Sequence, residues 1–186
     1  MARSGNKKHS AKNVKYLTLA LLGVGLVGCS SVSNDTTLQC PEVSIISDGA
    51  ELIRFASGQP AVAQNIIHQE SFEGFAGSCE HNIDDAIMSV EIIPKIFSAK
   101  GPANMDGTAR FDYFVALSDS QGAIINKQRF PVNLTYLDDS SEILWQEDIP
   151  VTLTLPLKDG ESVTKYRIFI GLQLSRDELK YIKANR

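Results

Sequence analysis

From Pro41 onward, apolar residues recur at every second position of this chain, which is the pattern of half-buried β-strands rather than of helices. In the stretch MSVEI, Met88, Val90 and Ile92 alternate with Ser89 and Glu91. The same alternation places further apolar residues on the inward side of their strands, namely Phe111, Tyr113, Val115, Leu117, Ile143, Trp145, Ile149, Val151, Leu153, Leu155, Tyr166, Ile168, Ile170, Leu172 and Leu174. A chain with this pattern has to pair its strands into sheets that bury one face.

Clusters of Gly, Pro, Asp and Asn separate these apolar runs, as expected for turns between strands. Examples are SDSQGA (118–123), AKGPANMDGT (99–108) and LKDGES (157–162). The sequence therefore predicts about seven strands, near residues 43–46, 65–75, 87–97, 109–118, 123–134, 143–155 and 165–174. That number of hairpin-connected strands predicts an all-β fold, an antiparallel immunoglobulin-like β-sandwich.

Local signals refine this prediction at the prolines and at the C-terminus. Pro94, Pro131 and Pro150 cannot donate to a ladder, so their strands are expected to be at edges, bulged or broken there. Ser175 and Glu178 have the spacing of a capping box, which predicts a short C-terminal helix. A further short helical turn is expected at DGAELIRFAS (48–57).

The N-terminal region has the layout of a secretory signal. Residues 1–15 contain five basic residues and no acidic one, and a short apolar run follows, from about Tyr16 to Val27. This run is shorter than the roughly 20 residues that a membrane-spanning helix needs. We therefore expect a cleaved signal and not a permanent span.

The apolar run ends in Leu26-Val27-Gly28-Cys29, which resembles the lipobox of bacterial lipoproteins. The resemblance implies that the Cys29 thiol receives a diacylglycerol, that cleavage occurs between Gly28 and Cys29, and that the new amine is acylated with a fatty acid such as palmitate. Ser30 in place of Asp favours the outer membrane over the inner. The alternative is an ordinary cleaved signal with an incidental cysteine.

These features divide the chain into a signal peptide (1–28), a lipidated cysteine with a polar tether (29–39) and a sandwich domain (40–186). Residues 29–186 contain 13 basic and 22 acidic residues, so their net charge is −9. Such an acidic domain, with no basic stripe in its sequence, is a poor candidate for binding nucleic acid or a polyanionic surface. The expected location is the periplasmic side of the cell envelope, with membrane lipid as the partner of acylated Cys29.

Two cysteines, Cys40 and Cys79, remain once Cys29 carries lipid. An even pair in an exported protein predicts a disulfide, because the periplasm keeps thiols oxidised. The alternative is a redox or metal-binding pair, although neither cysteine belongs to a Cys-x-x-Cys motif.

Two further resemblances concern the sandwich domain. The hairpin YFVALSDSQGAIINKQRF (113–130) resembles the central hairpin of immunoglobulin-like and fibronectin-type domains. CPEVSIISDGAELIRF (40–55), FVAL (114–117) and the ending SRDELKYIKANR (175–186) are together similar to small alphaproteobacterial lipoproteins of unassigned function. The second resemblance implies a location and implies no activity.

Catalytic and metal-binding signatures are weak in this sequence. His81, Asp84 and Asp85 lie close together, but a polar turn near a cysteine explains them equally well. His68 is interpreted as an ordinary strand residue, and the pairs Asp84-Asp85 and Asp138-Asp139 do not form persuasive acid–base dyads. No nucleophile elbow, zinc-binding helix or phosphate-binding loop is found. We therefore predict no catalytic residues, no metal and no cofactor.

Two function classes remain open. The first is a non-catalytic structural or interaction module that presents strand edges or loops to another envelope protein. The second is a small-ligand-binding or hydrolytic domain, which requires a concave site with converging polar groups. The sequence favours the first, with residues 99–108 and 157–162 as the expected contact loops.

Overall fold

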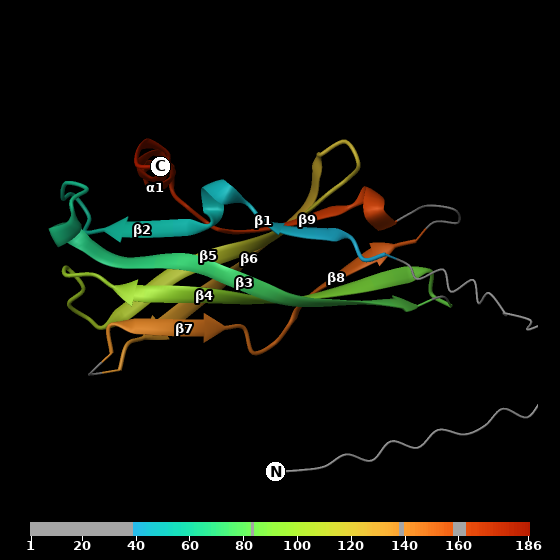
Figure 1. Ribbon diagram of the computed structural model, residues 1–186, viewed down its shortest axis with the longest axis horizontal. Coiled ribbons are helices and arrows are strands. Elements are labelled where there is room, and N and C mark those ends of the chain that lie inside the picture. Colours follow the sequence, from blue (N-terminus) through green and yellow to red (C-terminus); the bar gives the residue numbers. More distant parts are fainter. Residues whose placement is uncertain (1–38, 83, 138–139, 158–162) are drawn as a thin grey trace, which may run out of the picture. The chain divides into compact units, whose positions relative to one another are not determined.

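Two β-sheets pack face to face in the computed structural model, which describes residues 39–82, 84–137, 140–157 and 163–186 (Figure 1). The four-stranded sheet has the order β1 (Glu42–Ile45), β9 (Arg167–Leu172), β5 (Thr108–Ser118), β6 (Ile124–Thr135). The five-stranded sheet has the order β2 (Glu51–Phe55), β3 (Ile66–Asn82), β4 (Ile87–Lys100), β7 (Glu142–Gln146), and β8 (Val151–Pro156) also pairs with β4. The all-β sandwich is confirmed, with nine strands among the described residues instead of about seven.

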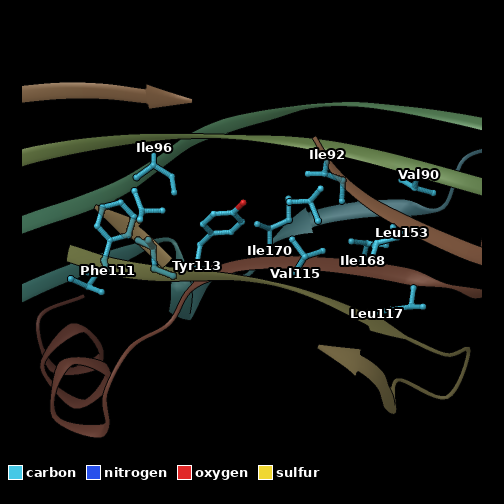
Figure 2. Close-up of a cluster of buried hydrophobic side chains, with 14 of the residues drawn as sticks. Val90, Ile92, Ile96, Phe111, Tyr113, Val115, Leu117, Leu153, Ile168 and Ile170 are labelled. Carbon is cyan, nitrogen blue, oxygen red and sulfur yellow. The ribbon is translucent and has the colours of Figure 1, made fainter. Parts of the chain in front are cut away.

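The core lies between the inner faces of the two sheets, and Figure 2 shows side chains of both sheets pointing toward one another. Ile92 and Ile96 of β4 meet Tyr113 of β5 and Ile170 of β9, and all four are at most 1% exposed. Full burial of a side chain of this size contributes roughly 1.5–3 kcal/mol. The period-two pattern of the sequence therefore identifies the inward positions of β4, β5, β8 and β9 correctly.

Strand β2 arises where the sequence predicts a helical turn, and strand β3 is longer than predicted. The segment predicted as a helical turn (48–57) contains a single 3₁₀ turn, η1 (Ser47–Gly49), followed by strand β2. Strand β2 pairs antiparallel with β3 and buries Leu52. Strand β3 also extends to Asn82, well beyond the predicted end near residue 75.

The predicted strand 143–155 is two strands, because the chain leaves the sheet at Glu147–Pro150. Pairing of β4 with β8 ends at Ile92, and pairing of β4 with β7 begins at Lys95. Pro94 lies between these points, so the N–H that proline lacks has no strand to pair with there. The Pro94 carbonyl accepts a hydrogen bond from the Glu147 N–H at 3.2 Å. Ile149, predicted to face inward, lies in the connection and is 78% exposed.

The pairing is not entirely antiparallel, because β1 runs parallel to β9. After β1, the chain does not turn back as a hairpin. Instead η1 leads it from the four-stranded sheet into β2 of the five-stranded sheet (Figure 1). This crossing brings Ile46 close to Gly171, where a Cβ atom would lie 2.9 Å from an Ile46 side-chain carbon.

The helix α1 (Arg176–Ala184) begins with the predicted capping box. The Ser175 N–H donates to Glu178 Oε2 at 2.7 Å, and the Glu178 N–H donates to Ser175 Oγ at 3.3 Å. Arg54 of β2 donates to Glu178 Oε1 at 2.9 Å, which joins the helix to the sheet. Partial burial raises the pKa of Glu178, but the bonds from Ser175 and Arg54 outweigh it, so this pKa lies below its ordinary value.

Gly101 lies where the loop after β4 folds against the start of β3, and a Cβ atom there would lie 2.2 Å from the Ile66 carbonyl oxygen. Because the obstacle is backbone, we expect Gly101→Ala to displace the loop and to lower the free energy of unfolding by about 1–3 kcal/mol. Urea denaturation measures this loss. The control variant is Ala61→Ser on an exposed loop, which should change the free energy of unfolding little. Gly122→Ala is not a suitable control, because Gly122 has a φ of +82° and alanine there would strain the backbone. A Gly101→Ala protein as stable as wild type would contradict the packing described.

Candidate functional site

The predicted lipid-attachment site lies outside the described residues. The signal peptide (1–28), the cleavage point Gly28–Cys29 and the tether up to residue 38 all belong to this part of the chain. Within the ranges that the structure describes, no helix is long and apolar enough to cross a membrane.

The Cys40–Cys79 disulfide predicted from the sequence is present, with a Cα–Cα distance of 5.9 Å. Cys79 pairs with Val90 in the β3–β4 ladder, while Cys40 lies just before β1. The bond therefore attaches the segment that follows the tether to the far half of β3. Within the part of the chain that the structure describes, that half pairs only with β4, because β2 pairs with β3 only as far as Ser71.

Three loops meet at one end of the sandwich, the end at which β3 begins, β4 ends, β5 begins and β6 ends (Figure 1). We call it the loop end; it comprises residues 56–65, 101–107, 136–137 and 140–141. The N–H groups of Gly101 and Ala103 donate to the carbonyls of Ile67 and Ile66 at 2.8 and 2.9 Å. The Tyr136 N–H donates to the Gly107 carbonyl at 2.9 Å, so these hydrogen bonds join the second loop to the start of β3 and to the third loop.

Asn104 shapes the second of these loops from within. Its side chain is buried and donates to the carbonyls of Ile67 and Thr108 at 3.1 and 2.8 Å, and it accepts from the Gly107 N–H at 2.8 Å. The next residue, Met105, is 94% exposed. A buried amide with three bonds thus holds a loop that presents an apolar side chain to solvent.

Two more exposed apolar residues lie at the loop end. Leu137 follows Tyr136 directly and is 76% exposed, and Val62 precedes the 3₁₀ turn η2 (Ala63–Asn65) and is 46% exposed. Exposed apolar groups gathered at one end of a domain are typical of protein contact sites. Only residues 99–108 were among the contact loops predicted from the sequence.

Behind the loop end lies a buried chain of polar side chains. His68 Nδ1 is 2.8 Å from Glu70 Oε1, and the two side chains are 4% and 0% exposed. Ser98, opposite Glu70 on β4, donates to Glu70 Oε1 at 3.0 Å. Since the Ser98 hydrogen is directed to Glu70, the Tyr136 hydroxyl donates to Ser98 Oγ, at 2.8 Å. These hydrogen-bonded side chains hold Tyr136 in place and thereby fix the backbone that carries Leu137.

The order of these groups differs from that of a nucleophile triad. In such a triad the serine donates to the histidine and the carboxylate lies behind the histidine. Here the serine and the histidine both contact the same carboxylate, that of Glu70. Burial raises the pKa of Tyr136, its bond to Ser98 partly opposes this, and the nearby charge of Glu70 raises it further. Tyr136 therefore stays a neutral donor, which suits a structural role.

No family model, curated protein or solved structure matches this chain. The site is therefore defined by its own geometry.

The structure describes the other residues singled out from the sequence as follows. Among the described residues, no group of three or more His, Cys, Asp or Glu side chains is placed to hold a metal ion. His81 is exposed, and Asp85 is bonded to Asn82, which donates to Asp85 Oδ2 at 2.6 Å. Asp138, Asp139 and residues 158–162 of the second predicted contact loop lie outside the described residues. His68 is a strand residue, as interpreted, but its burial and its pairing with Glu70 were not foreseen.

The edge of β6, which ends the four-stranded sheet, is a poor template for an added strand. The Asp112 carbonyl on β5 accepts a hydrogen bond from the Gln173 N–H at 2.8 Å, so the backbone polar groups of Asp112 are directed away from β6. Pro131 is the residue of β6 that pairs with Asp112, and its backbone polar groups are therefore directed away from β5, toward the free edge of the sheet. Pro131 offers no N–H there, and Lys127 and Arg129 occupy the same edge. Proline and charged side chains are common devices against edge-to-edge pairing. This favours the loop end over the β6 edge as the contact site.

Proposed function

We propose that this protein is a lipid-anchored bacterial lipoprotein, facing the periplasm and held through acylated Cys29 to the outer membrane, whose sandwich is a non-catalytic interaction module. The module docks on another envelope protein through the exposed apolar residues of the loop end, Val62, Met105 and Leu137. The lipobox-like Leu26–Cys29 supports the anchor.

The observation that carries the docking role is the exposure of Met105 on a loop held from within. Met105 is 94% exposed, yet the loop is fixed by the three bonds of Asn104. A side chain presented by a fixed loop loses little conformational freedom on binding, and unbranched Met adapts to the surface that it meets. The tether also confines the module near the membrane, which raises its effective concentration toward a neighbouring envelope protein.

For the anchor, we expect Cys29→Ala to abolish incorporation of labelled palmitate, because only the thiol accepts the diacylglyceryl group. Ser31→Ala, two residues away, should leave labelling unchanged. Mass spectrometry of the wild-type protein should find an N-terminal peptide that begins at acylated Cys29. A mature N-terminus elsewhere, or an unmodified Cys29 thiol, would contradict the anchor.

For the docking role, we expect Met105→Asp combined with Leu137→Asp to lower the recovery of the crosslinked partner at least about tenfold. The reason is that two carboxylates would have to lose water in an apolar contact. Recovery is measured after reversible crosslinking in intact cells. Ile149→Asp changes an equally exposed apolar residue outside the loop end and should have no effect.

The thermal midpoints of both variants should stay close to that of wild type, because surface substitutions usually change stability by less than about 0.5 kcal/mol. Equal losses in the Ile149→Asp and loop-end variants would refute a docking site at the loop end.

A further inference from the structure

The opposite end of the sandwich is where the chain enters the fold. In the four-stranded sheet, Glu42 pairs with Arg167, Arg167 with Ser118, and Ser118 with Ile124. The start of β1 therefore lies in one row with the β5–β6 turn. We call this end, with the turn and residues 40–42, the tether end.

Basic side chains dominate the outer face of the four-stranded sheet next to the tether end. Lys127, Arg129 and Arg167 lie on this face, and Arg129 and Arg167 are 62% and 64% exposed. The carboxylates of Asp112 and Glu42 also lie there, but at 3.9 and 3.8 Å from the nearest arginine nitrogens. Lys127 Nζ donates to Gln173 Oε1 at 3.0 Å and lies 3.9 Å from the centre of the Phe114 ring, so it has no carboxylate partner in these contacts.

Arg110, farther along β5, adds a fourth cation to the same face. Four cations against two carboxylates make this face basic in a domain that is acidic as a whole. The outer face of the five-stranded sheet has the opposite composition. It carries one lysine, Lys95, against five carboxylates, those of Glu51, Glu73, Glu80, Glu91 and Glu142.

An apolar pair stands beside the basic residues. Ile124 and Ile125, directly after the β5–β6 turn, are 55% and 53% exposed. Exposed aliphatic side chains flanked by Lys and Arg are what a protein uses to bind the interface of an anionic bilayer: the aliphatic groups enter the headgroup region and the cations approach the phosphates.

We infer that the tether end is a membrane-contact surface, in which Ile124 and Ile125 enter the headgroup region while Lys127, Arg129 and Arg167 contact the phosphates of anionic phospholipid. This inference rests on the proposed lipid anchor for the proximity of the bilayer. Ten residues, eight of them polar, separate Cys29 from Cys40. A flexible linker of ten residues spans only about 17–20 Å, so the tether end is within reach of the surface.

The contact gives the module an orientation. Strand β5 runs from the loop end to the tether end, and its 11 residues span about 35 Å. With the tether end on the bilayer, Met105 at the opposite end of β5 is presented away from the membrane, where a partner protein can reach it.

The test uses the acylated full-length mature protein with a photoreactive benzoylphenylalanine at position 125 or, as the matched control, at position 105. The protein is reconstituted into vesicles of phosphatidylethanolamine with or without phosphatidylglycerol, and lipid adducts are quantified after irradiation. We expect the adduct at position 125 to exceed that at position 105 at least fivefold, and only in vesicles that contain phosphatidylglycerol.

Lys127→Gln, Arg129→Gln and Arg167→Gln combined should lower the adduct at position 125 at least about fivefold, since one cation near an anionic surface already contributes about that factor. The control is a second triple variant that removes the same charge elsewhere on the domain, namely Lys95→Gln, Arg176→Gln and Lys180→Gln. This variant should leave the amount of lipid adduct at position 125 unchanged.

Any one of four results would overturn the membrane contact. Two concern the lipid adducts: equal amounts at positions 125 and 105, or amounts that do not depend on phosphatidylglycerol. The other two are equal effects of the two triple variants and a protein adduct at position 125. Flotation with vesicles that lack phosphatidylglycerol reports the acyl anchor separately. A protein that fails to float there but still gives the phosphatidylglycerol-dependent adduct would refute the anchor and retain the contact surface.

Discussion

Replacing His68 by Ala is expected to lower the free energy of unfolding by about 3–5 kcal/mol, because it opens a cavity and leaves the buried Glu70 carboxyl without its hydrogen bond to His68. The Glu70 side chain is fully buried and accepts from Ser98 as well, so it has no route to solvent in the folded state. The loss is thus expected to exceed that of an ordinary histidine truncation on a strand surface.

Urea denaturation of wild type, His68→Ala and His81→Ala measures this effect with a matched control. His81 lies on the same strand β3 but is exposed, so its loss should cost less than about 0.5 kcal/mol. Replacing both members of the pair, as in His68→Leu with Glu70→Met, should restore most of the loss, since a buried hydrogen-bonded pair exchanged for apolar groups of similar shape is often nearly neutral. Similar losses in His68→Ala and His81→Ala would contradict the buried pair.

The second large effect is expected for the disulfide. Cys79→Ala should lower the free energy of unfolding by about 2–5 kcal/mol, because the bond closes a loop between residues 39 positions apart and restricts the unfolded chain. The effect should be strongest on the segment before β1 and on the far half of β3, which are held together by this bond.

Cys40→Ala is the matched control for Cys79→Ala, and the double variant should be no less stable than either single one, because all three remove the same bond. Reductant should lower the unfolding midpoint of wild type and leave that of the variants unchanged. Two free thiols in protein isolated from the periplasm would contradict the bond.

The alternation of apolar residues was sufficient to predict the sandwich, because the inward faces of β4, β5, β8 and β9 each carry an unbroken period of two. The disulfide and the capping box were predictable for a similar reason: each depends on a few residues with a definite chemistry. Strand β2 was missed because ELIRF is too short to show a period, and only its pairing with β3 defines it as a strand.

The division of 143–155 into β7 and β8 depends on where β4 changes partners, which is information that the segment itself does not contain. The parallel pairing of β1 with β9 is likewise a long-range contact between the two ends of the domain. For both elements, tertiary pairing decided what the local sequence left open.

The candidate site was predicted only in part. The Gly, Pro and Asn content of residues 99–108 predicted the loop between β4 and β5, which the structure confirms. The polar chain behind the loop was not predicted, because it joins β3, β4 and the segment after β6, which are far apart in the sequence. One local signal was present: His68 and Glu70 are two residues apart on one strand and therefore share a face, which made a buried pair a testable alternative.

Photocrosslinking in intact cells tests the central proposal most directly. Benzoylphenylalanine at position 105 of the acylated protein should give one discrete protein adduct, which should be absent with the same probe at position 149. The adduct at position 105 should be lost when Leu137→Asp is added. No protein adduct at position 105, or the same adduct at positions 105 and 149, would contradict a protein-docking site at the loop end.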